Sequence, residues 1–204
     1  MIITKIERQK KKDRFNVHLD GEYAFAVDAD TLLNFRGLRV GNPLSDEEAS
    51  AIKSESEKRA AYARGFAYLS RGMHTLKETR DKLKKLSYTE CAITYALDRL
   101  NALGLVDDEA YARAYAETHD GRGRIRLKHE LSAKGVAKEV IDAVLDESLT
   151  EDEEITIATE LARKFFASSG DRTKVMRRLL NRGYSYSVIE SALLRAKLED
   201  EDEF

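Results

Sequence analysis

Few residues of this 204-residue chain have the types and spacing that metal, acid–base or nucleophilic chemistry requires. Asp107 and Asp108 form a carboxylate pair, but they stand where a helix is expected to begin, and acids there satisfy free amide groups. Cys91 has no histidine motif beside it that would activate a thiolate. The histidines lack zinc-ligand spacing and are scattered at His18, His74, His119 and His129. We therefore expect no metal site and no catalytic residue.

A polar stretch, SSGDRTK at 168–174, superficially resembles a phosphate-binding loop. It lacks the order GxxxxGK[ST] of such loops, and no strand is expected before it. The sequence therefore predicts no nucleotide site. We expect a protein that is not an enzyme and needs no cofactor.

Basic residues are more informative, because they cluster and recur. Residues 122–138 carry six Lys or Arg against one acid, and residues 163–182 carry seven against one. Arg124, Arg126 and Lys134 are followed forty-eight positions later by three further bases. This recurrence predicts a basic strip that faces DNA phosphates or an acidic protein surface, although a merely solvated helix face is the alternative. The predicted basic strip consists of Arg122, Arg124, Arg126, Lys128, Lys134, Arg172, Lys174, Arg177, Arg178 and Arg182.

The spacing of forty-eight belongs to a longer internal repeat that positions these bases. The segment 81–100 recurs at 129–148 and at 177–196. All three copies carry apolar residues at three equivalent positions, which in the first copy are Leu83, Ile93 and Leu97. The two later copies share five identities: Leu131/Leu179, Gly135/Gly183, Val140/Val188, Ile141/Ile189 and Leu145/Leu193. Repeats of this length are typical of arrays of small helical units, in which each unit completes its core against its neighbours. We expect Leu131 and Leu179 to lie in the cores of their repeats.

Capping residues mark where the helices begin. Helix starts are expected at Ser45, Thr75, Thr89, Asp107, Thr150 and Ser185. A long helix follows Ser45, with an expected break near the polar stretch SESEK at 54–58. Later helices are expected near 124–134, 137–148 and 171–182, and Gly135 and Gly183 are expected to end second helices with a left-handed residue. Ser87 stands at the corresponding place in the first copy.

The first forty residues differ in kind. Apolar and polar residues alternate on both sides of Asp20-Gly21, which predicts a β-hairpin. Leu32, Leu33 and Phe35 then indicate a short helix. The fold class is therefore mainly α, with three tandem three-helix repeats of period about 48 and a small N-terminal β-hairpin element. The expected divisions are an extension with a linker helix at 1–57, repeats at 58–106, 107–149 and 150–198, and an acidic tail at 199–204.

Composition sets the remaining expectations. Hydrophobic residues make up 42% and charged residues 35%, and the formal net charge is −2. So much surface favours an elongated array over one large core. A single cysteine excludes an intramolecular disulfide framework and fits a reducing compartment, and no stretch is apolar enough for a signal peptide or a membrane span. We expect a cytoplasmic monomer with no membrane association.

Three segments together resemble the RecX family, regulators of the RecA recombinase. They are YLSRGMHTLKETRDKL at 68–83, LGLVDDEAYARAYAE at 103–117 and RIRLKHELSAKGVAKEVID at 124–142. The resemblance covers about residues 58–198, and Thr79 stands where the family usually has Leu. It implies a non-enzymatic protein of three tandem three-helix repeats. It also implies binding to the RecA filament on single-stranded DNA, with restraint of the filament's ATPase, strand-exchange and co-protease activities.

A direct nucleic-acid-binding protein of helical repeats is the alternative, since units with a basic second helix are similar to helix-turn-helix modules. Binding to bare DNA would then be dominated by phosphate contacts and fall steeply with salt. In the first hypothesis, binding to single- or double-stranded DNA alone is weak and the recombinase is essential. A sequence pI near 6.2 favours the first.

Overall fold

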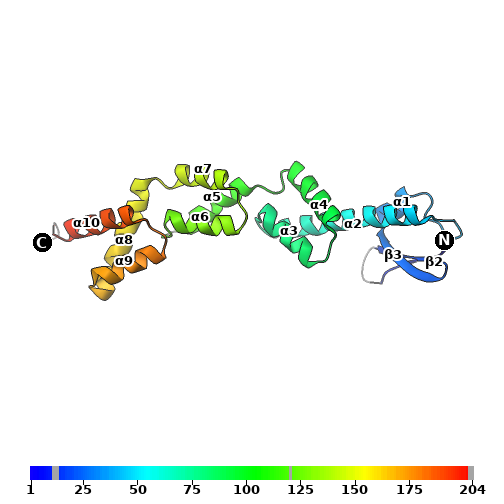
Figure 1. Cartoon of the computed structure of the whole chain (residues 1–204), viewed down its shortest axis with the longest axis horizontal. Coiled ribbons are helices and arrows are strands. Elements are labelled where there is room, and N and C mark those ends of the chain that lie inside the picture. Colours follow the sequence, from blue (N-terminus) through cyan, green and yellow to red (C-terminus); the bar gives the residue numbers. More distant parts are fainter. Residues whose placement is uncertain (11–13, 120, 202–204) are drawn as a thin grey trace. The chain divides into compact units, whose positions relative to one another are not determined.

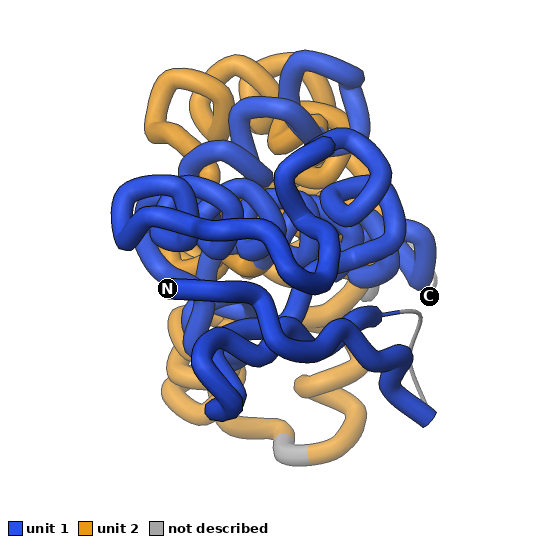
Figure 2. The backbone as a smooth tube through the Cα atoms, turned by 90° about the vertical axis from the view of Figure 1, so that its right-hand side faces the viewer, with its two compact units in different colours: residues 1–73, 79–106 blue, residues 74–78, 107–204 orange. Residues whose placement is uncertain are grey.

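The computed structural model describes residues 1–10, 14–119 and 121–201. The chain divides into two compact units (Figure 2). The first comprises residues 1–73 and 79–106, and the second comprises residues 74–78 and 107–204. Each unit is built from short elements that the sequence pattern anticipates (Figure 1).

The first unit opens with an antiparallel sheet in the order β1 (Ile3–Arg8), β2 (Arg14–Leu19) and β3 (Glu22–Asp28). Asp20 and Gly21 connect β2 to β3 with φ values of 49° and 90°. Two consecutive positive φ values are what a tight hairpin turn requires, so the predicted hairpin is confirmed. The inward-facing side chains of the sheet form a core of their own, which also includes Ile52 from the long helix over residues 46–69.

The helices of the first unit are α1 (Ala29–Asn34), α2 (Asp46–Leu69), α3 (Leu76–Lys85) and α4 (Glu90–Ala102). Those of the second are α5 (Asp108–Thr118), α6 (Arg124–Ala133), α7 (Lys138–Ser148), α8 (Glu151–Ser169), α9 (Arg172–Asn181) and α10 (Tyr186–Glu201). Helix α3 is divided between the units, because its first turn, residues 76–78, belongs to the second unit and the rest belongs to the first. The mainly α fold of tandem three-helix repeats with a small β element is confirmed.

The break expected near SESEK is wrong, because α2 runs without interruption through residues 54–58. Polar side chains in this stretch have partners that a reading of the sequence does not reveal. Ser56 is buried, and its hydroxyl donates to the carbonyl of Ala26 at 3.4 Å. Arg59 pairs with Glu55 one turn earlier at 3.3 Å. The helix therefore continues from the N-terminal extension into the first repeat.

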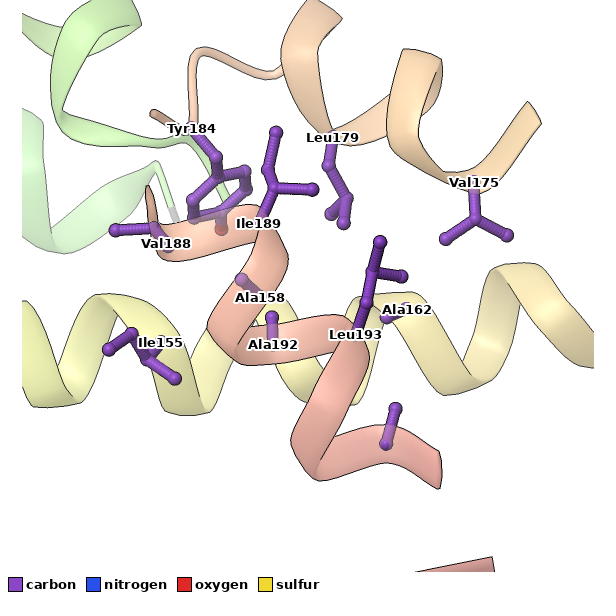
Figure 3. Close-up of a cluster of buried hydrophobic side chains, with 11 residues drawn as sticks. Ile155, Ala158, Ala162, Val175, Leu179, Tyr184, Val188, Ile189, Ala192 and Leu193 are labelled. Atoms are coloured by element: carbon purple, nitrogen blue, oxygen red, sulfur yellow. The ribbon is translucent and has the colours of Figure 1, made fainter. Parts of the chain in front are cut away.

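Each repeat has its own cluster of buried apolar side chains. The predicted core positions are confirmed, since Leu131 and Leu179 are fully buried, and so is the corresponding Leu83. Figure 3 shows the third cluster, in which Leu179 of α9 meets Leu193 of α10 over the small residue Ala162 of α8. Small residues on the first helix allow the other two helices to pack closely against it.

The predicted ends of the helices are also confirmed. Gly135 and Gly183 have φ values of 88° and 87°, and Ser87 adopts the same left-handed conformation at 60°. The side chains of Ser45 and Thr150 form complete capping boxes with the glutamates three positions later. At the other end, α10 continues to Glu201, so part of the predicted acidic tail is helical. Residues 202–204 of that tail lie outside the described residues.

Candidate partner-binding surface

In the second unit, the second helices of successive repeats meet at two junctions. At each junction, the start of the second helix of one repeat contacts the end of the second helix of the following repeat. In the first junction, the Thr75 hydroxyl donates to the carbonyl of Lys134 at 2.7 Å. The ammonium of Lys77 donates to the carbonyl of Ala133, also at 2.7 Å. Both carbonyls belong to the last turn of α6, where helix carbonyls lack partners within the helix. Side chains at the start of α3 therefore supply hydrogen-bond donors to the free carbonyls at the end of α6.

The second junction repeats this arrangement one repeat later. The amide of Gly123 donates to the carbonyl of Arg182 at 2.8 Å. The guanidinium of Arg126 donates to the carbonyl of Asn181 at 3.2 Å. The two acceptors stand forty-eight positions after those of the first junction, so the repeat in sequence is also a repeat of contacts.

Glycine is required at these junctions for two reasons. The positive φ of Gly183 favours glycine, as the sequence predicts, and the preceding repeat also approaches it closely. A Cβ on Gly183 would lie within 3.0 Å of the backbone of Arg126, and a Cβ on Gly123 would lie within 3.0 Å of the backbone of Gly183 and Tyr184. Gly135 is crowded in the same way by the side chain of Lys77.

The expectation that Asp107 and Asp108 serve as helix-start residues is confirmed. A carboxylate oxygen of Asp107 accepts from the amide of Ala110 at 2.9 Å. Asp108 accepts from the amide of Leu76 at 3.0 Å, so it also belongs to the first junction. Glu154 plays the same part in the second junction by accepting from the amide of Arg124 at 2.7 Å.

Several members of the predicted basic strip are already bound within the protein. Arg124 donates to the carbonyls of Leu145 and Leu149 at 2.7 and 2.6 Å and pairs with Asp146, so it closes the end of α7. Lys128 of α6 pairs with Asp142 of α7 at 2.5 Å. Arg124 and Lys128 therefore face α7 and do not form a free basic surface.

Arg122 and Arg126 share one acid, Glu130. Burial by itself raises the pKa of Glu130, but the donors Arg126, Arg122 and Tyr115 outweigh it and hold that pKa below its usual value. Glu130 is therefore an anion at neutral pH and offsets much of the charge of the two arginines.

Lys134 pairs with Glu78 across the first junction at 2.9 Å. Its ammonium also lies over the rings of Tyr111 and Tyr115, 5.3 and 5.4 Å from their centroids. A hydrogen bond with Tyr111 and the charge of Glu78 outweigh partial burial and raise the pKa of Lys134. Lys134 thus holds the first junction together.

The third repeat differs from the second. Arg182 donates to the carbonyl of Gly121 at 3.2 Å, and Arg172 pairs with Glu190 at 3.0 Å. The remaining bases of α9 are exposed and form the α9 basic face, which we define as Lys174, Arg177 and Arg178. Lys174 is 3.9 Å from Asp171, and Arg178 donates to the hydroxyl of Ser168 at 2.9 Å. Within the described residues, Arg177 has no ion-pair partner.

In the second unit, aromatic rings and bases that are far apart in sequence lie close together. The guanidinium groups of Arg178 and Arg182 lie 5.2 and 5.5 Å from the ring centroid of Phe165, and Lys134 covers two tyrosine rings. Helix packing brings together residues that are far apart in sequence. Phe165, Tyr111 and Tyr115 pack against the buried clusters of their repeats, so these rings belong to the hydrophobic core.

The acids that pair with these bases also recur in the sequence, and a search for bases alone misses them. Asp142 and Glu190 also stand forty-eight positions apart, and each pairs with a base of the second helix in its repeat. The acid recurs but its partner does not, because Lys128 and Arg172 occupy different positions of their repeats. Charge on the second helices is thus partly structural, and the α9 basic face is the part of the predicted strip with the weakest ion pairing, its one pair being 3.9 Å long.

The described part of the chain contains no group of three His, Cys, Asp or Glu side chains placed to bind a metal ion. Cys91 is exposed on α4 as a free thiol. Within residues 1–10, 14–119 and 121–201, no helix combines the length and apolarity needed to cross a bilayer.

Family models match three stretches of the chain. Residues 1–45 match the regulatory protein RecX N-terminal domain. Residues 61–100 match the RecX first three-helix domain, and residues 107–145 match the RecX second three-helix domain. The matched ranges contain the N-terminal sheet and two of the repeats described above.

Named relatives and solved structures agree with these matches. The chain is 37% identical to "Regulatory protein RecX" of Levilactobacillus brevis over 215 residues, which cover 99% of this chain and 79% of that protein. It is 32% identical to "Regulatory protein RecX" of Bacillus subtilis over 210 residues, covering 98% and 79%. A crystal structure of regulatory protein RecX aligns with a TM-score of 0.69 at 34% identity, covering 93% of this chain and 97% of the other. One of RecX from Lactobacillus salivarius aligns with a TM-score of 0.60 at 28% identity, covering 71% and 99%.

Proposed function

Because this chain belongs to the RecX family of regulatory proteins, we propose that it regulates the RecA recombinase. It binds the RecA filament on single-stranded DNA and restrains the ATPase, strand-exchange and co-protease activities of that filament. The observation that carries this proposal is the family match, which runs from the N-terminal sheet through two three-helix repeats. The protein acts without catalysis of its own, in the cytoplasm, as a monomer in contact with its partner.

The α9 basic face supplies the charge for that contact. Lys174 and Arg177 are exposed, and neither of them closes a junction between repeats. Charges at the rim of an interface steer association, and placing like charges opposite one another there costs several kcal/mol. Reversing these two charges is therefore expected to weaken the contact while leaving the helix and its core in place.

The test measures RecA ATPase on single-stranded DNA with increasing amounts of this protein. Wild-type protein is expected to inhibit, and the Lys174→Glu/Arg177→Glu variant is expected to need at least about tenfold more protein for the same inhibition, which corresponds to about 1.4 kcal/mol. The matched control is Arg36→Glu/Lys53→Glu, the same change of charge at two exposed bases of the first unit. Circular dichroism checks that both variants keep their helices.

Two outcomes count against the proposal at different levels. If wild-type protein at saturation leaves the ATPase unchanged, the regulatory role is wrong. If wild-type and double variant inhibit equally, the role stands but the α9 basic face is not the contact. The alternative, direct DNA binding through the second helices, has less support, because Arg124 and Arg126 already bind acceptors within the protein.

A further inference from the structure

The first unit contains a groove that none of the sequence signals indicated. It has a volume of about 690 Å³ and lies along α2, with walls from the N-terminal sheet, from α4 and from the loop that precedes α4. Cavities of this size commonly hold ligands. Four arginines line it, and they come from three separate elements: Arg14, Arg59, Arg64 and Arg99.

Few carboxylates pair with these arginines. Among the described residues, only Arg59 of the four pairs with a carboxylate, that of Glu55 at 3.3 Å. Arg14 donates from one terminal nitrogen to a backbone carbonyl at 2.9 Å, and its buried Nε has no hydrogen-bond partner among the described residues. Arg64 and Arg99 are exposed, and within the described residues neither forms an ion pair. The exposed guanidinium groups of Arg64 and Arg99 can therefore reach an anionic ligand.

Three tyrosines line the same groove. Tyr62 lies under the guanidinium of Arg99, 5.6 Å from the ring centroid, and Tyr95 lies under the ammonium of Lys58 at 5.7 Å. Tyr88 stands on the remaining wall, and its hydroxyl donates to a carbonyl of α2 at 3.4 Å. The small side chains of Ala60, Ala63 and Ala67 of α2 also line the groove and leave room for a ligand.

The two acids at the margin do not cancel this charge. Asp28 is the N-cap of α1, and its carboxylate accepts from the amide and hydroxyl of Thr31 at 2.7 and 2.9 Å. Asp30 follows in the first turn of that helix, where an acid complements the helix dipole. Arg59 is already paired with Glu55, and the other three arginines outnumber these two acids, so the groove is net positive.

We propose that this groove binds a short stretch of single-stranded nucleic acid. Arg64 and Arg99 contact phosphates, and bases stack on the rings of Tyr62 and Tyr95. Proteins that bind single strands without sequence preference combine a positive groove with aromatic side chains in this way, since every base has a flat face. This site goes beyond the proposed function, because it needs no recombinase.

An acidic peptide is the other ligand class that four arginines attract. Carboxylates would engage the guanidinium groups but would leave the tyrosine rings without a stacking partner. Rings and cations occur together between α2 and α4, because each helix contributes one tyrosine and one cation to the two pairs. Phosphates joined to flat bases use both kinds of group. The nucleic-acid ligand therefore accounts for more of the groove.

The first experiment measures binding of a fluorescein-labelled oligothymidylate by anisotropy, with no recombinase present. We expect wild-type protein to bind and the Arg64→Glu/Arg99→Glu variant to bind at least tenfold more weakly. The control Arg36→Glu/Lys53→Glu changes the charge of the same unit equally outside the groove and is expected to stay within twofold of wild type. Arg64→Gln/Arg99→Gln, a milder change, is expected to show an intermediate loss if the reversed variant fails to fold.

The second experiment detects stacking. The chain has no tryptophan, so Tyr95→Trp gives a single reporter in the groove. Oligothymidylate is expected to quench its emission, whereas inorganic polyphosphate, which has no bases, is expected to leave it unchanged. Tyr62→Trp provides a second reporter on the other wall.

Three results would overturn the proposal. They are the absence of oligonucleotide binding, equal loss in the groove and control variants, and displacement of the oligonucleotide by poly-glutamate at equal concentration of charge, which would assign the groove to an acidic peptide. Failure here leaves the recombinase assay unaffected, so the two proposals can fail separately.

Discussion

Arg124 and Arg172 occupy the same position in successive repeats, yet they do different things. Arg124 is three-quarters covered and binds two carbonyls at the end of α7, whereas Arg172 is about half exposed and makes one pair with Glu190. A cation that fills the free carbonyls of a helix end is part of the fold, while an exposed pair is worth little. The same residue type at the same repeat position therefore does not establish the same role.

This difference predicts unequal effects on stability. We expect Arg124→Ala to lower the free energy of unfolding by about 1–3 kcal/mol, because it leaves two carbonyls and one carboxylate without their donor. Arg172→Ala serves as the matched control and is expected to cost less than about 0.5 kcal/mol. Urea denaturation followed by circular dichroism measures both values. Equal effects would show that the contacts of Arg124 contribute nothing beyond those of a surface pair.

At the scale of elements, the junction between repeats is the unit that recurs. The start of a second helix donates to the last carbonyls of the next second helix, once from residues 75–77 and once from residues 123–126. Gly123 has an ordinary φ of −73°, so its small size and not its backbone angle is what the junction needs. The close approach to Gly183 leaves no space for a methyl group.

Gly123→Ala is therefore expected to destabilise the junction by about 1–3 kcal/mol, the usual cost of forcing extra atoms into a packed site. Gly37→Ala is the control, since a Cβ there would meet nothing within 4 Å. Denaturation gives the loss of stability, and hydrogen exchange at the amide of Ile125, which donates to Gly183 at 3.1 Å, locates it. Unchanged exchange at Ile125 in the alanine variant would contradict the steric account.

At the scale of the whole molecule, carboxylates paired with bases link stability to pH. The pKa of Asp142 is lowered by its hydrogen bond with Lys128, and that of Glu147 by its hydrogen bonds with Arg113. Burial raises the pKa of Glu78, but hydrogen bonds from Lys134 and Thr75 outweigh it and leave the pKa lowered. Carboxyls with a lowered pKa in the folded state stabilise the fold above their unfolded pKa values, and this stabilisation is lost as pH falls through the folded values.

The protein is accordingly expected to keep constant stability from neutral pH down to about pH 4.5, the ordinary value for a glutamate, and to lose it progressively at lower pH. Urea midpoints at pH 7, 5 and 3.5 measure the trend. The Glu78→Gln/Glu130→Gln variant is expected to begin less stable at pH 7 and to show a shallower decline on acidification. A decline as steep as that of wild type would mean that other carboxyls carry the effect.

Much of this architecture was determined by the sequence by itself, because it depends on local chemistry. Alternation around Asp20-Gly21, capping boxes at Ser45 and Thr150, and left-handed residues at Gly135 and Gly183 act over a few positions, so they can be recognised without coordinates. The period of forty-eight then relates one repeat to the next.

Only the tertiary structure decided which charges are free, because an ion pair depends on distance in space. Arg124 and Lys128 meet acids about fourteen to twenty-two positions away, on a different helix. The arginine and tyrosine groove joins the N-terminal sheet, α2 and α4, whose residues are up to eighty-five positions apart, from Arg14 to Arg99. No periodicity marks such a site, since its residues come together only when the helices and the sheet pack.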